Sequence, residues 1–127
     1  MNKKTMELLV KAESMLGAYS SLIERSSAIL ADTKKERREI DRVSDGLYGL
    51  RHSTQEVDFS SAKTRTKLAN AAGQLADYAW RLNQMALWAS AVEYAPGSGK
   101  MADTFERMSN AADAVRAQLE DMLASGE

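Results

Sequence analysis

The stretch that decides the fold is LANAAGQLADYAWRLNQMALWA, residues 68–89. Apolar residues recur in it at intervals of three and four, the period of an α-helix that buries one side. Because alanine lets two helix backbones approach closely, we expect a helix over residues 60–94 that packs tightly against its neighbours. The repeating positions form a seam: Leu68, Ala72, Leu75, Ala79, Leu82, Ala86 and Ala89.

The same spacing continues on both sides of this stretch and predicts three further helices, over residues 3–31, 34–52 and 100–124. Residues 53–59 break the period, and Pro96-Gly97-Ser98-Gly99 predicts a stop followed by a tight turn. We therefore predict an all-α protein, a three- to four-helix antiparallel bundle with a long, alanine-rich third helix. Because the helix lengths do not match, we expect the third helix to project beyond its neighbours or to meet another chain.

The boundary between the first two helices is the least marked. The apolar seam shifts phase near residues 31–35, and Thr33-Lys34-Lys35-Glu36 fits a capping box, in which a hydroxyl and a carboxylate satisfy free N–H groups at a helix start. A single kinked helix is the alternative, because neither Gly nor Pro marks the break.

Composition limits the classes of function. The chain has 127 residues, enough for a single domain with a core, and its 44% hydrophobic and 28% charged residues are typical of a globular protein. With no Cys and one His, it lacks the residues for disulfides, for thiolate or multi-His metal sites and for a Cys nucleophile. We therefore expect no metal and no other cofactor. A net charge of −1 argues against a protein whose whole surface binds nucleic acid.

No segment has the pattern of a targeting signal or a membrane span. Charged residues interrupt the apolar stretch after Lys3 and Lys4, and the longest nearly apolar run, residues 85–92, is too short to cross a bilayer. We expect a cytoplasmic protein that does not bind membranes.

Several polar motifs have a simple structural explanation. Gly97-Ser98-Gly99-Lys100 invites comparison with a phosphate-binding loop, but Tyr94 stands in place of its first Gly, Met101 in place of its Ser or Thr, and a helix in place of the preceding strand. The alternating acids and bases of residues 34–45 lack the Glu-x-x-His repeats of a two-metal site and fit a solvated helix face. His52 fits a surface histidine at a helix end. No catalytic residue is predicted.

Positive charge gathers where the second and third helices meet. In the first two turns of the third helix, cations oppose the helix dipole, and two more basic residues end the helix before it. Basic side chains around free N–H groups predict an anion site for a phosphate backbone, a nucleotide or an acidic protein patch. Local neutralisation by Glu56 and Asp58 is the simpler alternative. The basic cluster consists of Arg51, His52, Lys63, Arg65 and Lys67.

The second half of the third helix is apolar on almost every side, and Trp88 points nearly opposite the seam. Such a helix is either wrapped by the rest of the fold or in contact with a second chain. Trp, Tyr and Met are typical of binding hot spots. We expect Trp88 at an interface, whereas for Trp80 the core is favoured over an interface. The candidate partner-binding residues are Trp88, Trp80, Leu87, Tyr94 and Met85.

Three functional hypotheses remain. The favoured one is a small non-enzymatic protein–protein interaction module, such as an adaptor, chaperone or inhibitor, that binds a partner or itself through a helical face. Such proteins occur in secretion systems and on phages or other mobile elements. The second is a nucleic-acid-associated protein that uses the basic residues of 34–67, or an inhibitor whose acidic surface mimics nucleic acid. The third, an enzyme using Asp, Glu, Ser, Tyr and His52, has no supporting spacing. An acidic end opposite the basic one is predicted from Asp103, Glu106, Asp113, Glu120 and Asp121.

Overall fold

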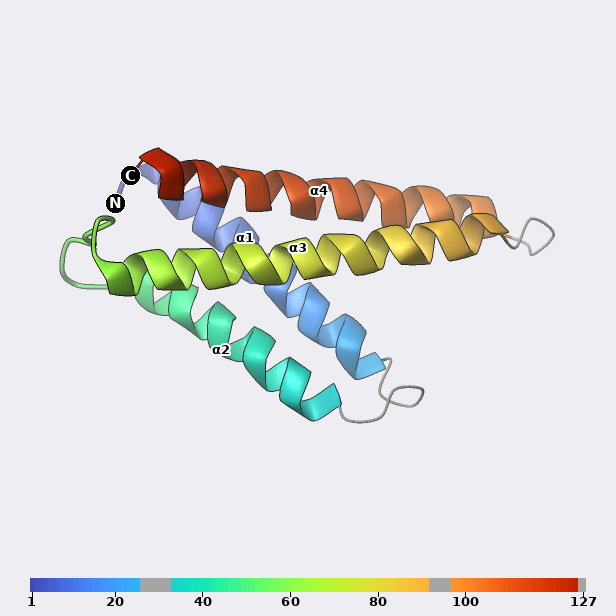
Figure 1. Cartoon of the computed structure of the whole chain (residues 1–127), viewed down its shortest axis with the longest axis horizontal. Helices are drawn as coiled ribbons and strands as arrows, with labels where there is room; N and C mark the ends of the chain where they lie inside the picture. Colours follow the sequence, from blue (N-terminus) through green and yellow to red (C-terminus); the bar gives the residue numbers. More distant parts are fainter. Residues whose placement is uncertain (26–32, 92–96, 126–127) are drawn as a thin grey trace.

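In the computed structural model, which describes residues 1–25, 33–91 and 97–125, the chain forms four helices and, over these residues, no strand (Figure 1). They are α1 (Lys3–Arg25), α2 (Thr33–Arg51), α3 (Ala62–Ala91) and α4 (Ser98–Ser125). The predicted all-α class and the long third helix are confirmed. The helix ends lie within two residues of the expected ones wherever both are described; the expected helical residues 26–31 and 92–94 lie outside the described ranges.

α1 and α2 form an antiparallel hairpin. Arg51 Nε lies 2.6 Å from Glu13 Oε2, and Arg37 Nη2 lies 3.6 Å from Glu24 Oε2. Residue numbers thus rise along one helix as they fall along the other, so the chain reverses direction between them (Figure 1). The alternative of one kinked helix is therefore wrong. The carboxylate of Glu36, expected to cap α2, accepts a hydrogen bond from Arg81 of α3.

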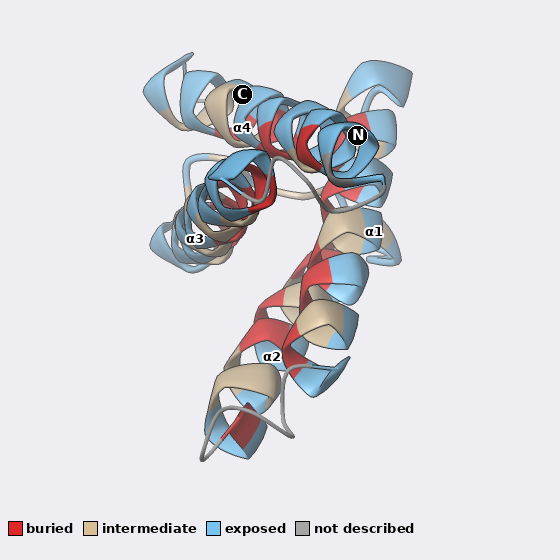
Figure 2. Cartoon of the chain, turned by 90° about the vertical axis from the view of Figure 1, so that its right-hand side faces the viewer, coloured by how far each residue is buried: buried red, intermediate tan, exposed pale blue. Residues whose placement is uncertain are grey.

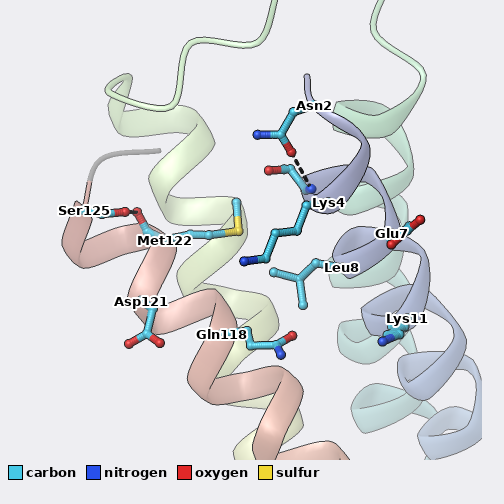
Figure 3. A pocket seen from close by; sticks show the side chains of 10 residues that line it. Asn2, Lys4, Glu7, Leu8, Lys11, Gln118, Asp121, Met122 and Ser125 are labelled. Carbon is cyan, nitrogen blue, oxygen red and sulfur yellow. Dashed lines mark hydrogen bonds between the residues drawn. The ribbon is translucent and has the colours of Figure 1, made fainter.

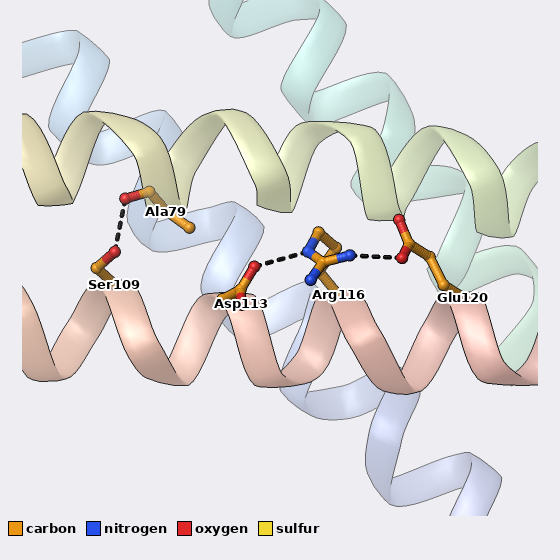
Figure 4. A network of polar contacts seen from close by, with 5 residues as sticks. All are labelled: Ala79, Ser109, Asp113, Arg116 and Glu120. Atoms are coloured by element: carbon orange, nitrogen blue, oxygen red, sulfur yellow. Dashed lines mark hydrogen bonds and ion pairs between the residues drawn. The ribbon is translucent and has the colours of Figure 1, made fainter.

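α3 and α4 form a second antiparallel hairpin, which the first one crosses obliquely (Figure 1). Small side chains lie between the two helices, and the Ser109 hydroxyl of α4 donates a hydrogen bond to the Ala79 carbonyl of α3 at 2.7 Å (Figure 4). The tight packing predicted from the alanine seam of α3 is therefore found against α4, because the small side chains let the two backbones approach closely.

A shared hydrophobic core joins the two hairpins. Every helix contributes fully buried leucines, such as Leu16 of α1, Leu47 of α2, Leu75 of α3 and Leu119 of α4. At the crossing, Tyr19 of α1 stacks on Tyr78 of α3 with ring centroids 4.9 Å apart. Figure 2 shows the buried residues on the inward sides of the helices. The core uses the positions that helical periodicity predicts.

Local hydrogen bonds define where α3 and α4 begin. The Ser61 hydroxyl accepts a hydrogen bond from the Thr64 N–H at 3.2 Å and so caps α3. Gly97 has φ of 81°, a left-handed conformation that favours glycine, and its carbonyl accepts a hydrogen bond from the Met101 N–H at 3.1 Å. The predicted tight turn is confirmed at Gly97, whereas Pro96 lies outside the described residues.

The end of the α3–α4 hairpin projects beyond α1 and α2, which diverge from it (Figure 1). Towards this end, the alanines at positions 86, 89 and 102 are buried and Met85 and Phe105 are half-buried, whereas Leu87, Trp88, Met101 and Met108 are exposed. No helix in the described ranges is long and apolar enough to cross a membrane.

Candidate functional site

The most unusual surface of the molecule is the side of α3 that faces away from the rest of the fold. Trp80 is 63% exposed, Leu87 is 59% exposed and Trp88 is 66% exposed. The core placement expected for Trp80 is therefore wrong. The reason is that α1 and α2 cover the side of α3 that carries Tyr78 and Arg81, and α4 covers the side that carries Ala79. α3 is thus covered on two sides and open on the third, instead of being wrapped by the other helices (Figure 2).

We define the outer face of α3 by the residues that continue the Trp80 position at intervals of three, four and seven. Its first half carries small side chains and its second half large ones. Gly73 in the first half faces open space, because a Cβ built there meets no heavy atom within 4 Å. Trp88 lies beside the second half. The outer face consists of Ala69, Gly73, Ala76, Trp80, Leu87 and Ala91, and the exposed polar residues Asn83 and Gln84 stand between its two largest side chains.

A notch of about 340 Å³ separates the end of α1 from the middle of α3. Arg81, Gln84 and Met85 line it, and Trp88 lies one turn or two further along the same side of the helix. Its complete lining is Leu22, Ile23, Trp80, Arg81, Gln84 and Met85.

A polar cluster at the base of the notch holds three helices together. Arg81 of α3 donates a hydrogen bond to Glu36 of α2, and its guanidinium carbon lies 5.6 Å from the centre of the Tyr19 ring of α1. Burial raises the pKa of Tyr19 to about 12; the carboxylates of Glu36 and Asp77 add to the rise, and Arg81 opposes it. This cluster joins α3 to both α1 and α2, so the helix that carries the outer face is held by two of its neighbours.

The five predicted partner-binding residues are thus distributed as follows. Trp80, Leu87 and Trp88 are exposed along one side of α3, and Met85 is half-buried in the notch. Tyr94 lies outside the described residues. The sequence analysis missed Leu22 and Ile23, which line the notch from α1, because their position depends on the angle at which the two hairpins cross.

The basic cluster is brought to one end of the molecule, but only part of its charge is free. The guanidinium of Arg51 binds the Glu13 carboxylate of α1, and this hydrogen bond raises the pKa of Arg51. The ring of His52 lies against Tyr48, with centroids 4.1 Å apart. Within the described residues, the other three members, Lys63, Arg65 and Lys67, make no ion pair.

The acid that neutralises Arg51 is therefore Glu13, and not Glu56 or Asp58 as the sequence alternative supposed. The Asp58 carboxylate accepts hydrogen bonds from the N–H and hydroxyl of Ser60, at 2.9 Å and 2.6 Å, which lowers the pKa of Asp58. Sequence inspection had no signal for Glu13, because the contact is created by the packing of α1 on α2. A site for a large anion is weakened by this internal pairing.

The acidic residues of α4 do not form the expected acidic end opposite the basic one. Arg116 binds both Asp113 and Glu120 on its own helix (Figure 4), so its single positive charge offsets one of these two negative charges. Because α4 runs antiparallel to α3, Glu120 and Asp121 lie at the end where α3 begins. These five acids are therefore divided between the two ends of α4.

A second hollow, of about 500 Å³, lies between the start of α1 and the end of α4 (Figure 3). Leu8 and Met122 give it apolar surface, and Lys4, Gln118 and Asp121 give it polar surface. It is open to solvent, and its polar side chains do not converge on one point as they do in a site built for a small molecule. Among the described residues, no group of three or more acidic or imidazole side chains is placed to hold a metal ion.

Comparison of the chain with protein-family models, with curated proteins and with solved structures finds no match.

Proposed function

We propose that this protein is a non-enzymatic protein–protein interaction module that binds its partner through the outer face of α3 and the adjoining Trp88. The observation that carries the proposal is the exposure of Trp80 and Trp88, at 63% and 66%, on one side of one helix. Tryptophan is among the residue types most enriched in binding hot spots, and contiguous exposed apolar surface is typical of interaction sites.

The form of the surface supports this proposal over an enzyme. The Tyr19–Glu36–Arg81 cluster joins α3 to α1 and α2 beside this surface, so a partner would meet a helix that is held by its neighbours. Catalysis needs convergent polar groups next to a cavity. In the notch, Arg81 is occupied by Glu36 and the remaining lining is mostly apolar, so a partner side chain suits it better than a reacting substrate.

The test compares capture of binding partners from the native host by three versions of the full chain. Trp88→Glu places a charge on the proposed surface, and Val10→Glu places one on an exposed apolar residue of α1, 44% exposed, as the matched control. We expect Trp88→Glu to lose the captured proteins, because a desolvated charge in the centre of an interface is costly, and Val10→Glu to retain them. Loss with both variants, or with neither, contradicts the proposal.

A further inference from the structure

We propose that the occupant of the outer face is a second copy of this chain, with the two α3 helices packed antiparallel about a twofold axis near residue 79. This inference rests on the proposed function and names the partner for the same surface. Three properties of the outer face carry it: the area it offers, the size of its side chains along the helix, and the placement of charge.

The first property is area. A tryptophan side chain offers up to about 250 Å², so Trp80 and Trp88 at 63% and 66% exposure leave roughly 160 Å² each open to solvent. In a twofold interface both copies contribute the same residues, so the area of each residue is buried twice. The indoles alone therefore supply roughly 640 Å², to which Leu87, at 59% exposure, and the small residues add. This total approaches the roughly 1,200 Å² at which stable interfaces begin.

The second property is self-complementary size. The outer face is small at Ala69, Gly73 and Ala76 and large at Trp80 and Leu87. An antiparallel pairing centred near residue 79 places Leu87 between Ala69 and Gly73 of the second copy. It places Trp80 between Ala76 and Trp80 of the second copy, so the two Trp80 indoles meet near the twofold axis. Leu87 thus meets small side chains in both directions, as close packing of two helices requires.

The third property is charge. The first two turns of α3 carry Lys63, Arg65 and Lys67, and the last two described turns carry no charged residue. A parallel pair would bring the basic first turns of the two α3 helices to the same end, although the Lys67 side chain itself lies against Gly46 of α2. The antiparallel pair separates these first turns by about 40 Å along the axis, several times the Debye length in physiological salt. It also places the carboxylate of Asp77 opposite Arg81 of the second copy.

Sedimentation equilibrium of the full chain from about 1 µM to about 1 mM tests the inference directly. We expect the mass to rise from 14.0 kDa towards twice that value. Gly73→Glu should raise the dissociation constant at least about tenfold, because it fills the hole that receives Leu87. Gly73 faces open space and glutamate favours helix more than glycine does, so the variant should fold.

Gly17→Glu is the matched control, because Gly17 is also an exposed helical glycine with nothing within 4 Å of a built Cβ, but on α1. We expect it to dimerise like the parent chain. A monomer at every concentration, or equal dimerisation of the Gly73→Glu and Gly17→Glu variants, overturns the inference.

Orientation is tested by spin labels on single cysteines, which the chain otherwise lacks. In the antiparallel pair, labels at Gln84→Cys are separated by about 15 Å along the axis and labels at Ala91→Cys by about 36 Å. Equal separations at the two positions indicate a parallel pair and overturn the proposed geometry.

The two proposals fail in different ways. If the chain stays monomeric but Trp88→Glu still abolishes partner capture, the dimer is wrong and the interaction module stands. If Trp88→Glu changes neither association nor capture, both are wrong.

Discussion

Two leucines on α3, little more than one turn apart, should respond very differently to the same substitution. Leu82 is fully buried in the core, whereas Leu87 is 59% exposed on the outer face. Leu82→Ala and Leu87→Ala remove the same atoms from the same helix and change helix propensity equally. The difference in their effect on the free energy of unfolding therefore measures burial alone.

The magnitudes follow from the two environments. Truncating a fully buried leucine costs about 2.7–5 kcal/mol, because transfer energy is lost and a cavity remains. Burying a whole leucine side chain is worth about 1.5–3 kcal/mol, and Leu87 hides about two fifths of its surface, so Leu87→Ala should cost about 1 kcal/mol and leave no cavity. For a chain of this length about 1 kcal/mol corresponds to about 4 °C in melting temperature. Leu82→Ala should thus lower it by more than about 10 °C.

Urea unfolding followed by far-ultraviolet circular dichroism, with protein at about 1 µM to keep any association small, measures both variants. Val10→Ala on α1, 44% exposed, gives the baseline for a truncation at an exposed site. Equal losses for the two leucine variants would refute the assignment of one side of α3 to the core and the other to the surface.

Three further predictions concern the fold. Burial raises the pKa of Tyr19 from 10.0 to about 12, so the neutral hydroxyl contributes stability below pH 10 that is lost as the pH rises from 10 towards 12. Tyr19→Phe should therefore make the free energy of unfolding depend less on pH in this range. An unchanged pH dependence contradicts the burial of the hydroxyl. Ser61→Ala removes the cap of α3 and should cost about 1 kcal/mol in urea unfolding, with Ser60→Ala, outside the cap, costing less; the reverse order contradicts the assignment. Gly17→Ala should raise stability by about 1 kcal/mol, because the site is helical and open; a loss would show that Gly17 contacts something.

The sequence was sufficient for the helices and for most of the core because both depend on local periodicity. Leu75 and Leu82 on α3, and Ala112 and Leu119 on α4, are each seven residues apart, and all four are fully buried. The turn at Gly97 was equally local, since its positive φ is a property of one residue.

The arrangement of the helices was not accessible in this way. Trp80 was expected in the core because an apolar residue beside a seam is usually covered, and only the crossing angle of the two hairpins shows that no helix covers it. The pairing of Glu13 with Arg51 and the contribution of Ile23 to the notch depend on the same angle. Periodicity defines which side of a helix is apolar, but not which neighbour lies against it.

The central claim, that the outer face of α3 is a protein-binding surface, is tested most directly by the chain's two tryptophans, because both lie at this surface and no other residue contributes indole fluorescence. Acrylamide quenching is measured from about 1 µM to about 1 mM protein, and again with captured partner added. We predict strong quenching at the lowest concentration that falls as the surface becomes covered. Indoles already shielded at the lowest concentration, or fully accessible under every condition, would contradict the claim.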